Sequence, residues 1–155
     1  MATDLGRPAV TIKLTYIVSH PIQYQAPLLR RIEKKEGINL RVVFEKNPMG
    51  SAYFDSGFKR LVEWDVPLTD GYESVSLADT DLSSEIEKAD VLWLHGWGSP
   101  VMRKALVLAR RRGVPVFMRG ENCDLAMPDG TGPRGWLKRL YIGWILRQCR
   151  AFLAI

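Results

Sequence analysis

The chain has 155 residues, of which 46% are hydrophobic and 25% are charged. This ordinary globular mixture excludes a collagen-like repeat, a disordered chain and a bundle of membrane helices, and the length fits one compact domain. The net charge of +5 is unevenly placed, because residues 1–100 carry 11 basic and 14 acidic side chains whereas residues 101–155 carry 11 and 3. We therefore expect a single domain, flexible over residues 1–10, whose positive end is either a solvated face or a site for anionic lipid or phosphate.

The first half of the chain alternates between strand and helix patterns. The β-branched and aromatic run at 11–18 predicts a strand buried on both faces. An apolar stripe over 26–35, ended by Gly37, predicts a helix, and residues 39–45 return as a strand. The next segments are predicted as a loop at 46–57, an extended segment at 61–66, a turn at 67–71 and a second extended segment at 72–77.

The second half repeats the alternation more clearly. Helices are predicted at 83–88, 100–112 and 134–149, and strands at 90–94, 115–118 and 151–155. A loop at 124–133 precedes the last helix. This order predicts a Rossmann-like three-layer α/β/α fold with a mostly parallel sheet and right-handed crossovers. Ligands bind at the carboxyl ends of the strands in such sheets, so we expect the site in the loops after Val18, Leu94 and Met118.

Cysteine usage and hydropathy indicate a cytoplasmic chain. Cys123 and Cys149 lack the close spacing of a zinc ribbon or a redox dithiol, which favours a reducing compartment. Residues 1–10 lack the apolar core of a signal peptide, and the uncharged apolar run at 140–146 is far shorter than the roughly 20 residues that span a bilayer. We expect a cytoplasmic protein, either soluble or peripheral at the inner face of the membrane.

Several nucleotide and hydrolase motifs are missing from the sequence. The loop after the first strand reads SHPIQYQ and not G-x-G-x-x-G, which disfavours NAD- or FAD-dependent chemistry. The P-loop motif of ATPases and the G-x-S-x-G elbow of hydrolases are also absent. No cofactor is therefore predicted.

Polar residues in the first loop suit a sugar or another polyol. His20 lies where the first strand ends, and the side chains of Gln23 and Tyr24 can hydrogen-bond to hydroxyl groups. The alternative is that His20 caps the following helix and Tyr24 packs on the edge of the sheet.

The loop after the strand at 90–94 has the features of an anion or sugar site. Ser99 suits a helix N-cap, and Gly96 lets the backbone approach a ligand. His95 can act as a base or donate to a substrate hydroxyl, with a purely structural histidine as the alternative. Trp97 is interpreted either as a stacking platform for a sugar ring or as a lid packed on the sheet.

Two opposite charges, Arg119 and Glu121, flank a glycine at the end of the strand at 115–118. They either belong to the site or form an internal ion pair. The spacing of His20, His95 and Glu121 matches no standard metal motif, so no metal site is predicted.

The last predicted helix combines large apolar side chains with cations. The apolar residues recur at helical spacing: Trp136, Leu137, Leu140, Tyr141, Trp144 and Ile145. The sequence favours core packing of this stripe against the sheet, and the alternative is an interfacial helix that rests on an anionic membrane through 134–150. No RNA-binding motif is present, so nucleic acid is not predicted as a partner.

Four stretches, taken in order, resemble the N-terminal domain of GT-B glycosyltransferases of the retaining family-4 type: IVSHPIQYQAPLLRRI, YFDSGFKRLVEWDVPLTDGYES, DVLWLHGW and VFMRGEN. In that family two Rossmann-like domains face each other across a cleft. The N-terminal domain holds the acceptor, and the C-terminal domain holds the nucleotide-sugar donor. The resemblance runs from about residue 11 to the end of the chain, and it implies the N-terminal half of a GT-B fold.

The resemblance implies which residues act. His95 and Glu121 would be catalytic, and five residues would bind the acceptor: His20, Gln23, Gly96, Trp97 and Arg119. The co-substrate would be a nucleotide sugar, and neither metal nor cofactor is implied. The acceptor would be a glycan, a lipid-linked sugar or a small molecule, as in polysaccharide biosynthesis.

The family's donor domain has no counterpart in these 155 residues. We therefore expect a donor domain or partner chain to complete the enzyme, with this chain inactive alone and its apolar edge covered by a partner or a second copy. Two alternatives stay open: a non-catalytic sugar- or lipid-binding subunit that needs a partner chain, and a generic Rossmann-like nucleotide-binding protein.

Overall fold

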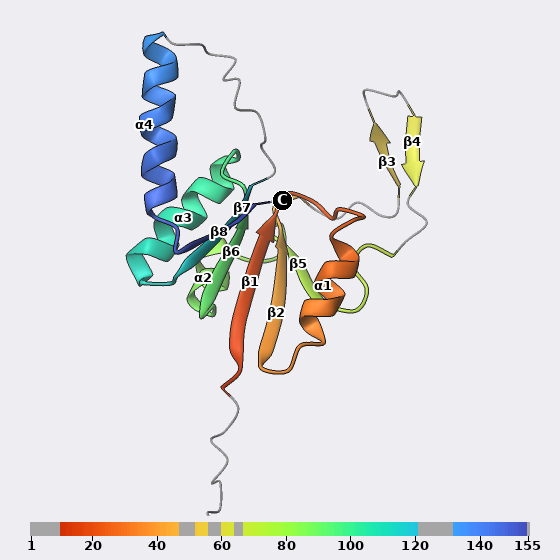
Figure 1. The fold of residues 1–155 in the computed structure, drawn as a ribbon. Helices are drawn as coiled ribbons and strands as arrows, with labels where there is room; N and C mark the ends of the chain where they lie inside the picture. Colours follow the sequence, from red (N-terminus) through yellow and green to blue (C-terminus); the bar gives the residue numbers. More distant parts are fainter. Residues whose placement is uncertain (1–9, 47–51, 56–59, 64–66, 121–131, 155) are drawn as a thin grey trace, which may run out of the picture.

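The computed structural model describes five ranges of the chain: 10–46, 52–55, 60–63, 67–120 and 132–154. Strands and helices follow one another along these ranges (Figure 1). In chain order they are β1 (Ile12–Val18), α1 (Ala26–Glu33), β2 (Ile38–Phe44), β3 (Ala52–Asp55), β4 (Arg60–Glu63), β5 (Glu73–Ser76), α2 (Leu82–Glu87), β6 (Val91–His95), α3 (Pro100–Arg112), β7 (Val116–Gly120), α4 (Pro133–Arg147) and β8 (Ala151–Ala154).

The main sheet has six parallel strands in the order β5-β2-β1-β6-β7-β8. The chain builds outward from β1 on one side through β2 and β5. It then crosses to the other side and continues through β6, β7 and β8. This is the strand order of Rossmann folds, and it confirms the predicted α/β class and parallel sheet.

Helices cover both faces of the sheet, which confirms the three-layer architecture (Figure 1). On one face Leu29 of α1 belongs to a buried cluster with Tyr16 and Val42. On the other face Ile86 of α2 and Leu106 of α3 belong to a second buried cluster. The central strand β1 contributes to both clusters, because successive side chains of a strand point to opposite faces.

Helix α3 begins and ends where the sequence predicts. The Ser99 hydroxyl accepts a hydrogen bond from the Met102 N–H at 3.1 Å, and Pro100 occupies the first turn, where no N–H is needed. Gly113 ends the helix with φ +73°, in the left-handed region that favours glycine. These caps fix the position of the loop that joins β6 to α3.

Two short strands form a separate sheet: β4 overlaps the predicted extended segment at 61–66, whereas β3 differs from the sequence prediction. β3 falls inside the predicted loop at 46–57 and pairs antiparallel with β4, apart from the main sheet. Tyr53 lies opposite Val62, and Phe54 lies opposite Leu61. These residue types favour extended pairing, and they find it locally instead of in the main sheet.

Helix α4 does not pack into the core as predicted. Figure 1 shows it projecting past the carboxyl ends of the strands. Only Gly135 and Ile145 are buried in this helix, whereas Trp136 and Leu137 are 60% and 59% exposed. The prediction was wrong because helical periodicity identifies an apolar stripe but does not show what lies against it. No helix in the described ranges is long and apolar enough to cross a membrane.

The last turn of α4 joins the body of the protein. Ile145 is fully buried in the cluster beneath α2 and α3, and Cys149 packs against the same cluster. The Cys149 thiol donates to the Ile145 carbonyl at 3.5 Å, and burial raises its pKa to about 11. The anchored part of α4 is thus its carboxyl end.

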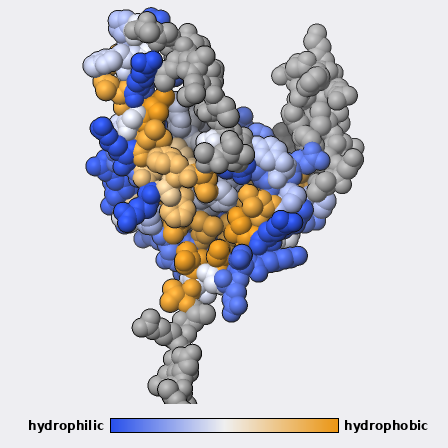
Figure 2. Space-filling model, viewed as in Figure 1, coloured by the Kyte–Doolittle hydropathy of each residue, from blue (hydrophilic) through white to orange (hydrophobic). Residues whose placement is uncertain are grey.

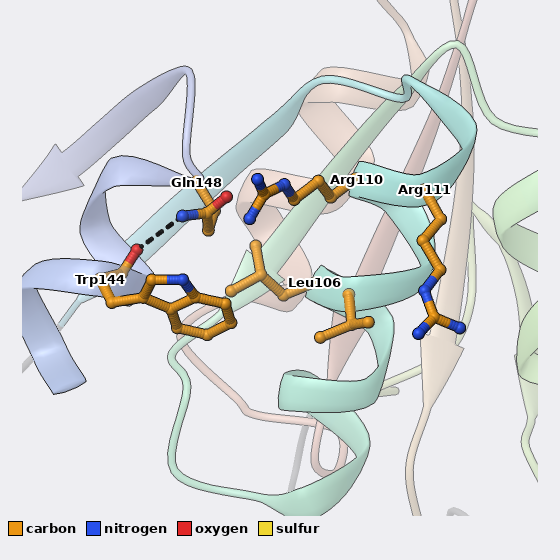
Figure 3. Close-up of a pocket in the computed structure, with 6 residues that line it drawn as sticks. Leu106, Arg110, Arg111, Trp144 and Gln148 are labelled. Carbon is orange, nitrogen blue, oxygen red and sulfur yellow. Dashed lines mark hydrogen bonds between the residues drawn. The ribbon is translucent and has the colours of Figure 1, made fainter.

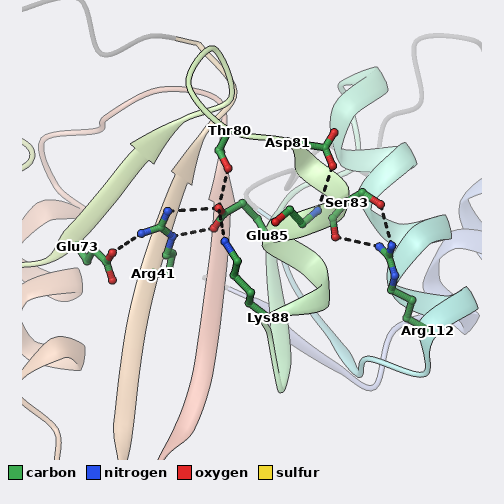
Figure 4. Close-up of polar contacts among 9 residues, drawn as sticks. Arg41, Glu73, Thr80, Asp81, Ser83, Glu85, Lys88 and Arg112 are labelled. Carbon is green, nitrogen blue, oxygen red and sulfur yellow. Dashed lines mark hydrogen bonds and ion pairs between the residues drawn. The ribbon is translucent and has the colours of Figure 1, made fainter.

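A buried carboxylate ties α2 to the strands beside it (Figure 4). Glu85 is 1% exposed and accepts hydrogen bonds from Arg41 Nε at 2.7 Å and from the Thr80 hydroxyl at 2.7 Å. Arg41 also pairs with Glu73, and Lys88 Nζ lies 3.6 Å from Glu85. Burial alone would raise the pKa of Glu85, but the hydrogen bonds from Arg41 and Thr80 outweigh it, so its pKa is lowered.

We predict that Glu85→Gln lowers the free energy of unfolding by about 2 kcal/mol at neutral pH, because charge-assisted hydrogen bonds are lost. A lowered carboxyl pKa stabilises the fold above the unfolded-state pKa, and this stabilisation is lost as the pH falls through the folded-state pKa. The difference between wild type and variant should therefore shrink towards acid pH. Urea unfolding at neutral and acid pH measures it, with the exposed Glu87→Gln as control. A difference that stays constant with pH would contradict this assignment.

Candidate functional site

The sheet places its topological switch point between β1 and β6. After β1 the chain turns to α1 on one face, and after β6 it turns to α3 on the other. The two loops therefore diverge at the carboxyl ends of neighbouring strands, which is where open parallel sheets bind ligands. The candidate site lies there.

Three side chains from distant parts of the chain meet at this point. The Tyr16 hydroxyl lies 2.7 Å from His95 Nδ1 and donates to Gln25 Oε1 at 3.0 Å. Gln25 Nε2 lies 3.1 Å from His95 Nδ1 and 3.4 Å from His95 Nε2. Tyr16 and Gln25 are buried, and His95 is half-buried. We call these three residues the Tyr–Gln–His cluster.

Strand register explains how the cluster forms. Tyr16 of β1 lies opposite Trp93 of β6, and the two rings are 4.3 Å apart between centroids. His95 follows Trp93 by two residues, so it points to the same face of the sheet as Tyr16. Gln25 is the N-cap residue directly before α1, and α1 covers that face. Each side chain is thus positioned by regular backbone.

The hydrogen bonds hold His95 mainly through Nδ1. This atom lies 2.7 Å from the Tyr16 hydroxyl and 3.1 Å from Gln25 Nε2, whereas the contact of Nε2 with Gln25 is longer, at 3.4 Å. A neutral imidazole carries its proton on one ring nitrogen and accepts at the other, so the tautomer decides which partner donates to Nδ1. The cluster therefore fixes the orientation of the ring.

A buried cation lies next to the cluster. Arg119 of β7 pairs in register with His95, and its Cζ lies 5.9 Å from the centroid of the Tyr24 ring. Only 6% of Arg119 is exposed. The Gly96 N–H donates to the Arg119 carbonyl at 2.8 Å, and Gly96 has φ +83°, which favours glycine at this turn. The site therefore combines an imidazole with a guanidinium that suits an oxygen-rich ligand.

The first loop places its two predicted residues at the surface. Gln23 and His20 are both exposed, and the ring of His20 is hydrogen-bonded through Nδ1 to the Ser19 hydroxyl at 2.8 Å. Burial of its ring and the nearby Lys46 lower the pKa of His20. Helix α1 begins after Gln25, so His20 is not its cap.

The remaining predicted residues lie apart from the cluster or outside the described ranges. Trp97 packs against the core on the opposite face of the sheet, and its ring meets that of Tyr141 edge to face at 6.4 Å. Glu121 lies outside the described residues. In the part of the chain that the structure describes, no group of His, Cys, Asp and Glu side chains could hold a metal ion.

Sequence reasoning missed Tyr16 and Gln25. Tyr16 carries a weak signal, because it is the one hydroxyl-bearing ring in an apolar buried strand and needs a polar partner there. Gln25 carries no signal that separates it from Gln23 two residues earlier. Only the three-dimensional structure shows that Gln25 faces inward.

Comparisons with known proteins support the fold alone. No protein-family model matches the chain, and no curated protein matches it. A solved structure of a conserved protein from Enterococcus faecalis V583 is similar, with a TM-score of 0.52 and 16% identity over 94% of this chain and 92% of that one. This similarity agrees with the Rossmann-like architecture.

Two further solved structures are more distant. DNA processing protein A from Helicobacter pylori matches with a TM-score of 0.43 and 14% identity over 91% of this chain and 75% of that one. A UDP-N-acetylglucosamine 2-epimerase from Rickettsia bellii matches with a TM-score of 0.40 and 15% identity over 87% of this chain and 37% of that one.

We predict that Tyr16→Phe lowers the free energy of unfolding by about 2 kcal/mol, because Gln25 and His95 lose a buried hydrogen-bond partner. Nitrogen NMR of His95 should show one dominant tautomer in the wild type and a loss of that preference in the variant, because Tyr16 and Gln25 both contact Nδ1. Tyr141→Phe, at a partly exposed ring on α4, is the matched control. An unchanged tautomer preference in Tyr16→Phe would contradict the role of Tyr16 in holding the imidazole.

Proposed function

We propose that this chain is the acceptor-side domain of a cytoplasmic glycosyltransferase. The enzyme transfers a sugar from a nucleotide-sugar donor to a hydroxyl of a glycan, lipid-linked or small-molecule acceptor. The observation that carries the proposal is the Tyr–Gln–His cluster beside Arg119 at the switch point of a Rossmann-like sheet. The sequence resemblance to the N-terminal half of GT-B enzymes supports the same assignment.

In this proposal His95 assists the acceptor hydroxyl. Its Nε2 would take a hydrogen bond from the attacking hydroxyl in place of the long contact with Gln25, while Nδ1 keeps its bond to Tyr16. Gln25 and Tyr16 hold the imidazole in one orientation, so the ring does not have to be ordered when the acceptor binds.

Other groups of the site would position the acceptor. The guanidinium of Arg119 can donate to sugar oxygens, and the exposed side chains of His20 and Gln23 border the same edge of the sheet. Glu121 follows Arg119 closely in sequence and is proposed as the second catalytic group. The donor would be held by a second domain or by a partner chain.

The loop after β1 argues against donor binding by this chain. Rossmann-like proteins that hold a nucleotide at this point use glycines there, so that the backbone can approach the phosphates. Here the loop contains His20, Pro21 and Gln23, and the buried Gln25 occupies the start of α1. This composition is suited to hydroxyl groups more than to a pyrophosphate.

We predict that calorimetric titration detects binding of acceptor sugars or glycolipids and no binding of nucleotide sugars. His95→Ala should weaken acceptor binding about tenfold, since one hydrogen bond to the ligand and the order of the cluster are lost. Arg119→Gln should weaken it similarly. Lys34→Gln, which also removes a cation but lies at the far end of α1, is the matched control.

Two results would contradict the proposal. Binding of free nucleotides or nucleotide sugars by this chain would replace the proposal with a generic Rossmann-like nucleotide-binding protein. Acceptor binding that is unchanged in both His95→Ala and Arg119→Gln would exclude the assigned site.

A further inference from the structure

A cavity of about 300 Å³ lies between α3 and the last turns of α4, away from the Tyr–Gln–His cluster (Figure 3). Its lining is Leu106, Val107, Arg110, Arg111, Trp144 and Gln148. Figure 3 shows Leu106 and Trp144 on its apolar side, with the side chain of Arg110 extended towards Gln148. Gln148 Nε2 donates to the Trp144 carbonyl at 3.0 Å, which fixes one end of the lining.

The lining combines groups that suit an amphiphilic anion. Arg110 extends its planar guanidinium towards Gln148, and one guanidinium can bind two phosphate oxygens at once. Arg111 adds a second cation to the lining, with its side chain pointing away from that of Arg110. Leu106 and Trp144 offer apolar surface beside them. A ligand that carries a phosphate next to a hydrocarbon portion satisfies both halves of this lining, whereas a free phosphate satisfies only the arginines.

The surface around the cavity is both apolar and basic. On α4 the side chains of Trp136, Leu137 and Leu140 are 60%, 59% and 53% exposed. Figure 2 shows hydrophobic residues running along this projecting helix with hydrophilic residues beside them. Helices α3 and α4 carry nine Lys and Arg side chains and not one Asp or Glu.

We propose that the face formed by the end of α3 and by α4 rests on an anionic lipid bilayer and holds a lipid phosphate beside Arg110 and Trp144, with Arg111 as a second cation of the same face. Charge complementarity supports this choice of partner, because the cations of α3 and α4 attract anionic headgroups. Exposed Trp and Leu side chains add the apolar area that inserts at the boundary between headgroups and acyl chains.

Nucleic acid is the weaker partner for this face. Bases can stack on Trp136 or Trp144, and the arginines can bind backbone phosphates. Leu137 and Leu140, however, gain nothing from a polar polyanion, since their burial requires an apolar environment. A bilayer uses the leucines, the tryptophans and the cations together.

Vesicle cosedimentation of the full chain tests the proposal. The probes are vesicles of phosphatidylcholine alone and vesicles that also contain phosphatidylglycerol. We expect binding only to the anionic vesicles. The double variant Arg110→Gln, Arg111→Gln should weaken this binding about 30-fold, because each cation near an anionic surface contributes about fivefold to the affinity. Trp136→Ser should also weaken it, and its exposed position leaves the fold intact.

A matched control separates a local site from the overall positive charge. Arg31→Gln combined with Lys34→Gln removes the same charge from exposed positions of α1, on the opposite face of the sheet. This control should retain most of the vesicle binding. Equal weakening in both double variants would overturn the assigned face.

Three other outcomes would also overturn the proposal. The first is equal binding to vesicles with and without phosphatidylglycerol, or to neither. The second is displacement from vesicles by glycerol 3-phosphate at low concentration, which would identify a soluble phosphate as the ligand. The third is tighter binding to single-stranded DNA than to anionic vesicles, with the arginine variants affecting DNA alone.

Discussion

The parallel pairing of β1 with strands on both sides is the constraint on which the rest of the structure depends. Tyr16, Ile17 and Val18 of β1 are fully buried, so this strand cannot move to an edge without exposing apolar area. Parallel strands require crossovers, and every strand of the main sheet therefore ends at the same edge. The reversal of direction at β1 then separates the two loops that form the site.

Most of the fold follows from local sequence patterns, whereas part of the site does not. The capped helix α3 and the buried strands were predictable from Ser99, Gly113 and apolar runs, and the ends of those strands pointed to His95 and Arg119. Tyr16 contacts His95 across 79 positions of sequence. That contact depends on the register between β1 and β6, which composition and spacing do not encode.

The exposure of α4 and the pairing of β3 with β4 were unpredictable for a related reason. A stripe such as Trp136 and Leu140 looks the same in sequence whether a sheet covers it or nothing does. The aromatic residues of β3 likewise favour extended backbone without showing which strand will pair with them. In both cases the sequence does not show which segment packs against the helix or pairs with the strand, and only the folded chain shows it.

The half-buried thiol at the base of α4 makes the docking of this helix measurable by chemistry. Only the thiolate reacts with alkylating reagents, and a pKa of about 11 keeps Cys149 almost wholly protonated near neutral pH. Its bond to the Ile145 carbonyl and its contact with the core are both lost when the carboxyl end of α4 detaches. In a Cys123→Ser background, the alkylation rate of Cys149 therefore reports how often α4 opens away from the sheet.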